Sequence, residues 1–171
     1  MTPQEFQKRI QSMSVEIKKA IDVTIPRKVA NTAVLHFKQS FQDEGFTDEK
    51  LEKWKEVKRR QSPSRADLAN ANLPILTGTG DLGRSIQSKV EPGKVTVISD
   101  VPYAKAHKDG FSGTVSVKAH ERKRKDGGSS NIRAHSRNAN IPKRQFIGDS
   151  KVLDDKIKNV ITDELDKILG A

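Results

Sequence analysis

LPILTGTGDLGRSIQSKVEPGKVTVISDVPYAKAHKDG, residues 73–110, is the stretch in which the spacing of apolar residues changes from a helical period to a period of two. Apolar and polar side chains alternate over residues 85–90 and again over residues 94–99, on either side of a Pro-Gly pair at 92–93. Two alternating runs joined by such a turn predict a β-hairpin. We therefore expect helices before this stretch and an extension of the same sheet after it.

The glycines of this stretch match a dinucleotide-binding fingerprint, G-x-G-x-x-G, at Gly78, Gly80 and Gly83, with Asp100 at the end of the second predicted strand. That fingerprint requires a strand, a long crossover helix and a parallel strand. Here residues 84–90, which alternate, are all that separate Gly83 from the turn. We therefore predict that these glycines let the backbone turn before the hairpin, and that no cofactor binds.

Amphipathic patterns predict two helices within residues 1–45 and one over residues 150–169. The first begins at a capping box, Thr2-Pro3-Gln4-Glu5, and the last has Ser150 as its N-cap and Gly170 at its end. The sequence does not decide whether the first two helices form one kinked rod or a hairpin. The three expected apolar faces are Phe6, Ile10, Met13, Ile17 and Ile21; Val29, Ala33, Val34, Phe37 and Phe41; and Leu153, Ile157, Val160, Ile161, Leu165 and Ile168.

The positive charge of the chain is concentrated in one segment. The net charge is +10, and residues 118–144 hold nine Lys and Arg residues against Glu121 and Asp126. Weak alternation on either side of a Gly-Gly-Ser-Ser turn predicts a basic β-hairpin arm over residues 112–140, within a β-rich part at 73–148. Such a segment has few apolar side chains, so we expect it to be disordered or loosely paired until a partner orders it. Its expected contact residues are Arg122, Lys123, Arg124, Lys125, Arg133 and Arg137.

The composition predicts a single α+β domain over residues 1–171, with a small, mostly antiparallel sheet on 85–90, 94–99 and 114–120 packed by the terminal helices. One-third of the residues are hydrophobic and only 5% are aromatic, so we expect other subunits to complete part of the surface. With no cysteine and four scattered histidines, we expect neither a disulfide nor a metal site. No signal-peptide pattern or transmembrane run is visible, and we expect synthesis in the cytosol without membrane contact.

Three residues outside the hairpins are expected to have structural roles. Trp54, the only tryptophan, is expected to be a packing anchor. His107 has no nucleophile or carboxylate at a suggestive spacing, which favours a structural role. Phe146 lies in a turn at residues 142–148 that is expected to dock the last helix and bury its ring. The polar residues 59–72 predict a loop.

The order of these motifs resembles that of the phage virion morphogenesis family, the tail completion proteins of Mu-type and related tailed phages. The resemblance covers residues 30–169, and two departures are the doubled Thr-Gly at 77–78 and Gln145 in place of a second proline. The matching positions are Trp54, Ile75, Leu76, Thr79, Gly80, Leu82, Ser85, Ile86, Tyr103, Ala104, His107, Gly110, Pro142, Arg144, Phe146, Ile147 and Gly148.

The resemblance implies a structural virion protein without catalysis. It would act in the neck or at the head-proximal end of the tail as a homo-oligomeric, hexameric ring that helps to join tail to head. Its partners would be neighbouring connector and tail proteins, and DNA could pass its lumen. The protein would be located in the virion, after assembly in the host cytoplasm.

Two other classes of function are weighed against this one. A non-specific nucleic-acid-binding module is favoured by the pI of about 9.8 and by the basic residues of the 118–144 segment. That segment, however, has no interleaved aromatic residues for base stacking. An enzyme is disfavoured because no G-x-S-x-G elbow or metal motif frames the serines or His107.

Overall fold

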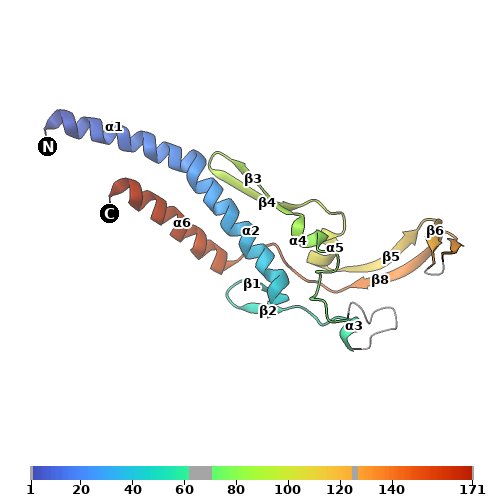
Figure 1. Cartoon of the computed structure of the whole chain (residues 1–171). Helices are drawn as coiled ribbons and strands as arrows, with labels where there is room; N and C mark the ends of the chain where they lie inside the picture. The colour runs from blue at the N-terminus through green and yellow to red at the C-terminus, as the bar shows by residue number, and fades with distance from the viewer. Residues whose placement is uncertain (1, 62–70, 125–126, 171) are drawn as a thin grey trace.

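The computed structural model describes residues 2–61, 71–124 and 127–170. A long helical rod forms one end of the molecule, and a two-stranded arm projects from the other end (Figure 1). Between them, short strands, short helices and a C-terminal helix surround the core. The predicted α+β class is confirmed, because helices and antiparallel strands occupy separate parts of the chain.

The N-terminal rod settles the question of a kinked rod or a hairpin. Helix α1 (Pro3–Lys19), a π-helical segment (Ala20–Thr24) and helix α2 (Ile25–Asp43) follow one another without a loop. Pro26 would clash with the carbonyl four residues earlier in a regular helix, and the wider π-helical turn before it relieves that clash. The predicted capping box is confirmed: Thr2 N donates to Glu5 (2.7 Å), and Glu5 N donates to the Thr2 hydroxyl (3.2 Å).

The described strands form four antiparallel pairs. The predicted hairpin is confirmed as β3 and β4, in which Val90 lies opposite Val95 across the Pro-Gly turn. The pairs are β1 (Gly45–Thr47) with β2 (Leu51–Lys53), β3 (Ile86–Glu91) with β4 (Lys94–Ser99), β5 (Phe111–Val117) with β8 (His135–Ile141), and β6 (His120–Lys123) with β7 (Ser129–Ile132).

Two expectations about the strands are wrong. Residues 114–120 do not extend the β3–β4 sheet, because the chain turns at Gly110 (φ 81°) and β5 then pairs with β8 over seven residues. Residues before the hairpin are not all helical, because α2 ends at Glu44 in the left-handed conformation (φ 49°) and β1 starts immediately after it. The predicted loop at 59–72 lies largely outside the described residues.

The fingerprint glycines lie in a turn and a very short helix. Gly78 and Gly80 (φ 79°) precede helix α4 (Asp81–Arg84), and Gly83 lies inside it. The strand that follows, β3, pairs with β4 in the antiparallel sense, so the described residues here contain no βαβ unit. Two other short helices are α3 (Lys58–Gln61) and α5 (Ala104–Asp109). Within the described residues, no helix combines the length and apolar character that crossing a membrane requires.

The core lies where α2 crosses β3, β1 and the segment that leads into the C-terminal helix α6 (Lys151–Leu169). Phe41 is central: its ring lies 5.6 Å from Trp54 and 5.4 Å from Phe146, centroid to centroid. Trp54 is therefore a packing anchor, as predicted. The buried cluster comprises Ala33, Phe37, Phe41, Phe46, Trp54, Ile75, Leu82, Ile86, Ala104, Phe146 and Leu153.

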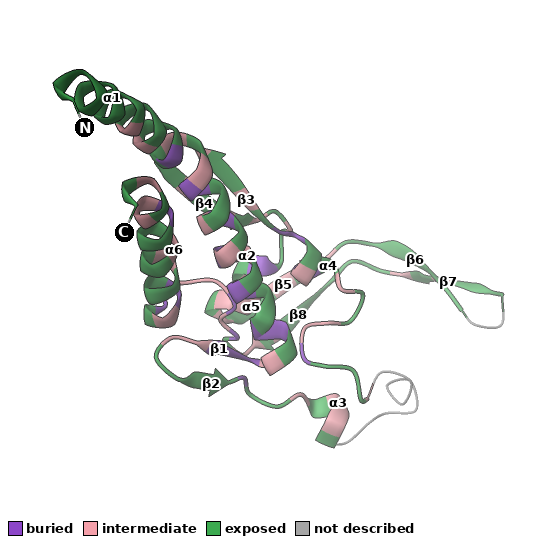
Figure 2. Cartoon of the chain, turned by 60° about the vertical axis from the view of Figure 1, so that its left-hand side comes forward, coloured by how far each residue is buried: buried purple, intermediate pink, exposed green. Residues whose placement is uncertain are grey.

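The outer helices are less buried than their apolar faces predict. None of the residues of α1 is buried, and Phe6 is 57% exposed. In α6, Leu153 is buried, but Ile161 is 36% exposed. Sequence patterns also missed Glu164, which is 9% exposed and accepts from Lys28 (2.6 Å) and Lys167 (2.5 Å). Figure 2 shows the same contrast, with buried residues gathered on α2 and none on α1.

Replacing Phe146 with alanine should lower the free energy of unfolding by about 3–5 kcal/mol, because it empties a large aromatic site. The ring is 1% exposed. The matched control is Phe6→Ala, which removes an exposed ring and should change the free energy by less than about 0.5 kcal/mol. Urea unfolding followed by circular dichroism measures both, and equal values for the two variants would contradict the assigned core.

Candidate assembly interface

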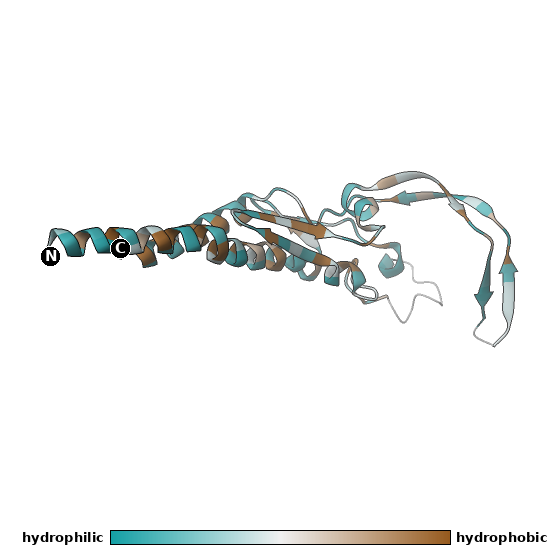
Figure 3. Ribbon diagram, turned by 90° about the horizontal axis from the view of Figure 1, so that it is seen from above, coloured by the Kyte–Doolittle hydropathy of each residue, from teal (hydrophilic) through white to brown (hydrophobic). Residues whose placement is uncertain are grey.

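The arm consists of a stem and a tip. The stem is the pair β5–β8, and the tip is the pair β6–β7 with the turn between them. Both His120 and His135, at the junction, hydrogen-bond through Nδ1 to the carbonyl two residues earlier, at 3.0 and 2.9 Å. Figure 3 shows the bend at this junction and the distance of the whole arm from the helices. The predicted basic hairpin is therefore present as paired strands.

The two faces of the stem differ in chemistry. Residues directly opposite each other in an antiparallel pair point to the same side of the sheet. One face holds the apolar residues together with His135 and Arg137. The other is uncharged and polar, and Thr114 donates there to the Asn138 side chain (3.0 Å). The polar face consists of Ser112, Thr114, Ser116, Ser136, Asn138 and Asn140. Most stem residues are exposed, so the stem gains little from packing on its own body.

The tip carries a net positive charge, and Glu121 is its one described acidic residue. Arg122 lies opposite Ser130, and Lys123 lies opposite Ser129, so no carboxylate faces them across the hairpin. Lys125 lies outside the described residues. Among the described residues, no ion pair forms at five exposed basic side chains of the arm: Arg122, Lys123, Arg124, Arg133 and Arg137. This excess of exposed basic side chains gives the tip a positive potential that attracts acidic groups.

The arm leaves the body at a backbone position that suits only glycine. Gly110 has φ 81° and ψ 159°, a region that side chains essentially exclude. A Cβ there would lie 3.1 Å from Lys143 N and 3.3 Å from Ile141 O. The residue after Lys143, Arg144, donates its backbone N–H to His107 O (2.8 Å). The two strands of the stem therefore enter and leave the body side by side.

The returning strand is held by three consecutive residues. The Arg144 guanidinium donates to Lys55 O, at 2.9 Å from Nη2 and 3.3 Å from Nε. Trp54 Nε1 donates to Gln145 O (2.7 Å). Phe146 then inserts its ring into the core beside Phe41. The chain returning from the arm is thus fixed by polar contacts from residues 54–55 and by aromatic packing.

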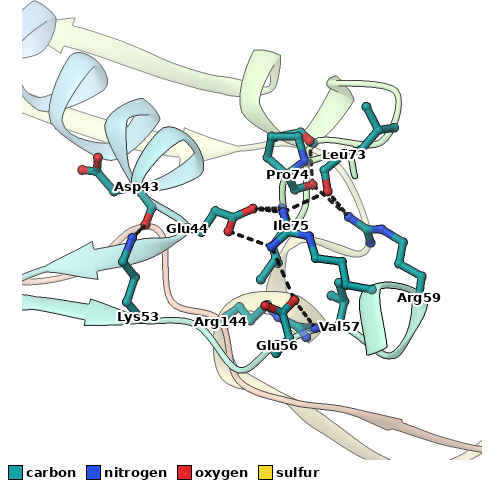
Figure 4. Close-up of polar contacts among 12 residues, drawn as sticks. Asp43, Glu44, Lys53, Glu56, Val57, Arg59, Leu73, Pro74, Ile75 and Arg144 are labelled. Atoms are coloured by element: carbon teal, nitrogen blue, oxygen red, sulfur yellow. Dashed lines mark hydrogen bonds and ion pairs between the residues drawn. The ribbon is translucent and has the colours of Figure 1, made fainter. Parts of the chain in front are cut away.

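A second set of polar contacts ties the end of α2 to the segment before α4 (Figure 4). The Glu44 carboxylate accepts from Arg60 at 2.5 and 2.9 Å and from Ile75 N at 2.7 Å. The hydrogen bond from Arg60 lowers the pKa of Glu44. These contacts place Ile75 in the core. Sequence reasoning missed them, because they join residues 16 and 31 positions apart without any local pattern.

Two ionisable groups lie beside the arm: Arg144, which is buried, and His107, which is half-buried. Arg144 is 7% exposed, and burial lowers its pKa. His107 has a buried Nδ1 without a hydrogen-bond partner among the described residues, and its ring lies edge-on to Tyr103 at 6.0 Å. Burial and the charge of Arg144 lower the pKa of His107. In its neutral form, the His107 ring is not repelled by the nearby Arg144 guanidinium.

The motif residues, dispersed in sequence, converge near the arm. One pocket is lined by Gly80, Leu82, Tyr103, His107 and Arg144, among others. Trp54 and Phe146 belong to the hydrophobic core. Gly110 and Pro142 flank the arm, and Gly148, which is half-buried, precedes α6. The basic residues of the tip, in contrast, lie away from this pocket (Figure 1). Among the described residues, no group of three or more His, Asp or Glu could hold a metal ion.

Comparison with known proteins gives one clear match. A family model described as the phage virion morphogenesis family matches residues 4–166. It confirms the family that the order of motifs indicated. No curated protein and no solved structure matches the chain.

Replacing Gly110 with alanine should destabilise the arm by about 1–3 kcal/mol, the usual cost of holding a side chain in a glycine-only conformation. Hydrogen exchange of the β5 and β8 amides should therefore become faster. Gly78→Ala is the matched control, because a Cβ at Gly78 meets nothing within 4 Å and its φ is not positive. Equal exchange in the two variants would contradict the role given to Gly110.

Lowering the pH from 7.5 to 5.5 should reduce the stability of the fold. Burial lowers the pKa of both His36 and His107 below the ordinary 6.5, so the unfolded chain binds more protons in this range. Their contribution is fully present above pH 6.5 and is lost as the pH falls through the lowered pKa values. Urea unfolding at the two pH values measures the slope, and His107→Gln should flatten it. A variant with the full wild-type slope would contradict the assignment of His107.

Proposed function

Because the chain belongs to the phage virion morphogenesis family, we propose that it completes the tail of a tailed phage or prophage and joins it to the head. The family gives the chain a structural role in virion assembly. The finer role, in the neck between connector and tail proteins, is our proposal. The arm is the single observation that carries it, because it is an extended, charged element that its own body does not cover.

The tip is suited to an acidic protein surface. Ordering a residue costs about 1–2 kcal/mol, and the tip has almost no apolar burial to offset this cost. Arginine and carboxylate form charge-assisted hydrogen bonds that are stronger than neutral ones. Arg122, Arg124 and Arg133 are exposed and can form them with a neighbour. The arm therefore gains its stability in the assembled neck.

A ring of identical subunits fits this shape. The rod and the arm leave the body at opposite ends, so one copy can present different surfaces to its two neighbours. Such head-to-tail contacts close into rings when the rotation between copies closes. Sixfold symmetry follows from the family resemblance alone. Exposed apolar side chains on α1, including Phe6 and Ile10, provide further surface for neighbours to cover.

The second candidate is non-specific binding of nucleic acid through the tip. The uncompensated charges favour it, since phosphate contacts require exposed Lys and Arg. Residues 112–140, however, contain no Phe, Trp or Tyr on which a base could stack. In a ring whose arms face the lumen, the same charges would meet the phosphates of passing DNA.

Replacing Arg122, Lys123, Arg124 and Lys125 with serine should leave the chain folded, because the described members of this set are exposed. The same change should leave tails and filled heads unjoined, which electron microscopy of an infected or induced culture can count. A matched control replaces four exposed lysines outside the arm and α1, Lys50, Lys94, Lys105 and Lys156, with serine. Joining that survives the first change, or fails equally in both, would contradict the proposal.

A DNA-binding assay separates the two candidates. Random-sequence duplex DNA is titrated with the purified chain at several salt concentrations. A steep loss of affinity with salt, absent in the serine variant, would favour nucleic acid. Binding that is equal in the variant and the wild type would leave the protein–protein role as the function of the tip.

A further inference from the structure

The described strands all lie in two-stranded sheets, so each strand has one edge whose backbone N–H and C=O groups are not used by another strand. Soluble proteins commonly protect such edges with Lys, Pro or other charged residues, because an unprotected edge pairs with further strands. Strand β5, Phe-Ser-Gly-Thr-Val-Ser-Val, has seven residues, no charge and no proline. In contrast, β3 contains Lys89 and Glu91. The edge of β5 is therefore the least protected long edge among the described strands.

The stem also needs further strands for its own stability. An isolated two-stranded hairpin is marginally stable in water, and three or more strands, or a helix packed on one face, are usually required. The described part of the body supplies neither: the stem residues are exposed or at most half-buried, and the described helices leave most of both faces uncovered (Figures 1 and 3). Pairing of the free edge with another strand would supply what the stem lacks.

We propose that the free edge of β5 pairs with β8 of a second copy of this chain. Within one chain, these strands match over seven residue pairs, with apolar residues opposite apolar residues and polar opposite polar at most positions. The free edge of each strand presents the same alternation as its paired edge. The Thr114–Asn138 hydrogen bond of 3.0 Å can therefore form again between copies.

Pairing of β5 with β8 uses both free edges of the stem. Two β5 strands could also pair across a twofold axis, but each β8 edge would then remain open. In the β5–β8 arrangement, the neighbour's β8 runs antiparallel to β5, so the two β5 strands run parallel. Copies related by rotation about an axis that runs roughly along the strands have this property. The inference rests on the proposed ring and names the contact between its subunits.

Cysteine cross-linking tests this contact in the purified full-length chain. The sequence has no cysteine, so any disulfide comes from the introduced residues. Thr114→Cys and Asn138→Cys chains are purified separately, mixed, and oxidised over a series of concentrations. The expected product is a covalent dimer of the two different chains, several-fold more abundant than either homodimer. Val115→Cys with Arg137→Cys repeats the test at the next pair, because disulfides do not fit every cross-strand site.

The matched control is Arg122→Cys mixed with Ser130→Cys at the tip. These residues are also directly opposite each other within a chain, but their strands carry charge. A second variant, Ser112→Lys with Ser116→Lys in the Thr114→Cys chain, protects the β5 edge and should abolish the mixed dimer. Circular dichroism confirms that each variant is folded.

Three results would overturn the inference: mixed dimers no more abundant than in the tip control, a dominant Thr114→Cys homodimer, or cross-linking unaffected by the lysines. The second would indicate twofold pairing of β5 strands. The test needs no virion, so its failure is distinguishable from failure of the proposed function. If cross-linking fails while the serine tip variant still prevents joining, the neck role stands and the ring uses another contact.

Discussion

The attachment of residues 144–146 to residues 54–55 by hydrogen bonds is the interaction on which the rest of this structure depends. The only tryptophan donates its indole N–H to Gln145 O, and the carbonyl of the next residue accepts from the Arg144 guanidinium. These hydrogen bonds fix the chain where it returns from the arm to the body. Phe146 can then fill the centre of the core, and α6 can begin at Ser150, whose hydroxyl accepts from Leu153 N. Without these hydrogen bonds, neither the arm nor the last helix would have a fixed direction relative to the body.

The ion pairs among the described residues gather in the body and are absent from the basic side chains of the arm. In the body, the carboxylates of Glu44 and Glu164 each accept from basic groups distant in sequence, and these bonds join separate elements. At the tip of the arm, the described basic side chains have no such partners. The exposed apolar side chains of α1 show the same dependence in hydrophobic terms. In the proposed assembly, neighbouring subunits would cover these exposed elements.

The sequence determined the elements that depend on neighbours in the chain. The capping box at Thr2, the Pro-Gly hairpin, the N-cap at Ser150 and the α+β class were predicted correctly, because each is set by residues a few positions apart. The burial of Trp54 and Phe146 was also predicted, for Trp54 as a packing anchor and for Phe146 as part of the turn that docks the last helix. The basic arm was recognised from its composition and its weak alternation.

Tertiary structure alone decided where these elements lie and which faces they bury. The apolar faces of α1 and α6 have helical spacing, but spacing does not say whether another element lies nearby, and α1 projects beyond the body. Strand partners were mistaken for the same reason: β5 has the pattern of a sheet strand, and the turn at Gly110 directs it to β8 rather than to β3–β4. The Glu44–Arg60–Ile75 contacts and the burial of Glu164 had no local pattern at all. Such contacts depend on the free energy of the whole packed chain, which no short window of sequence contains.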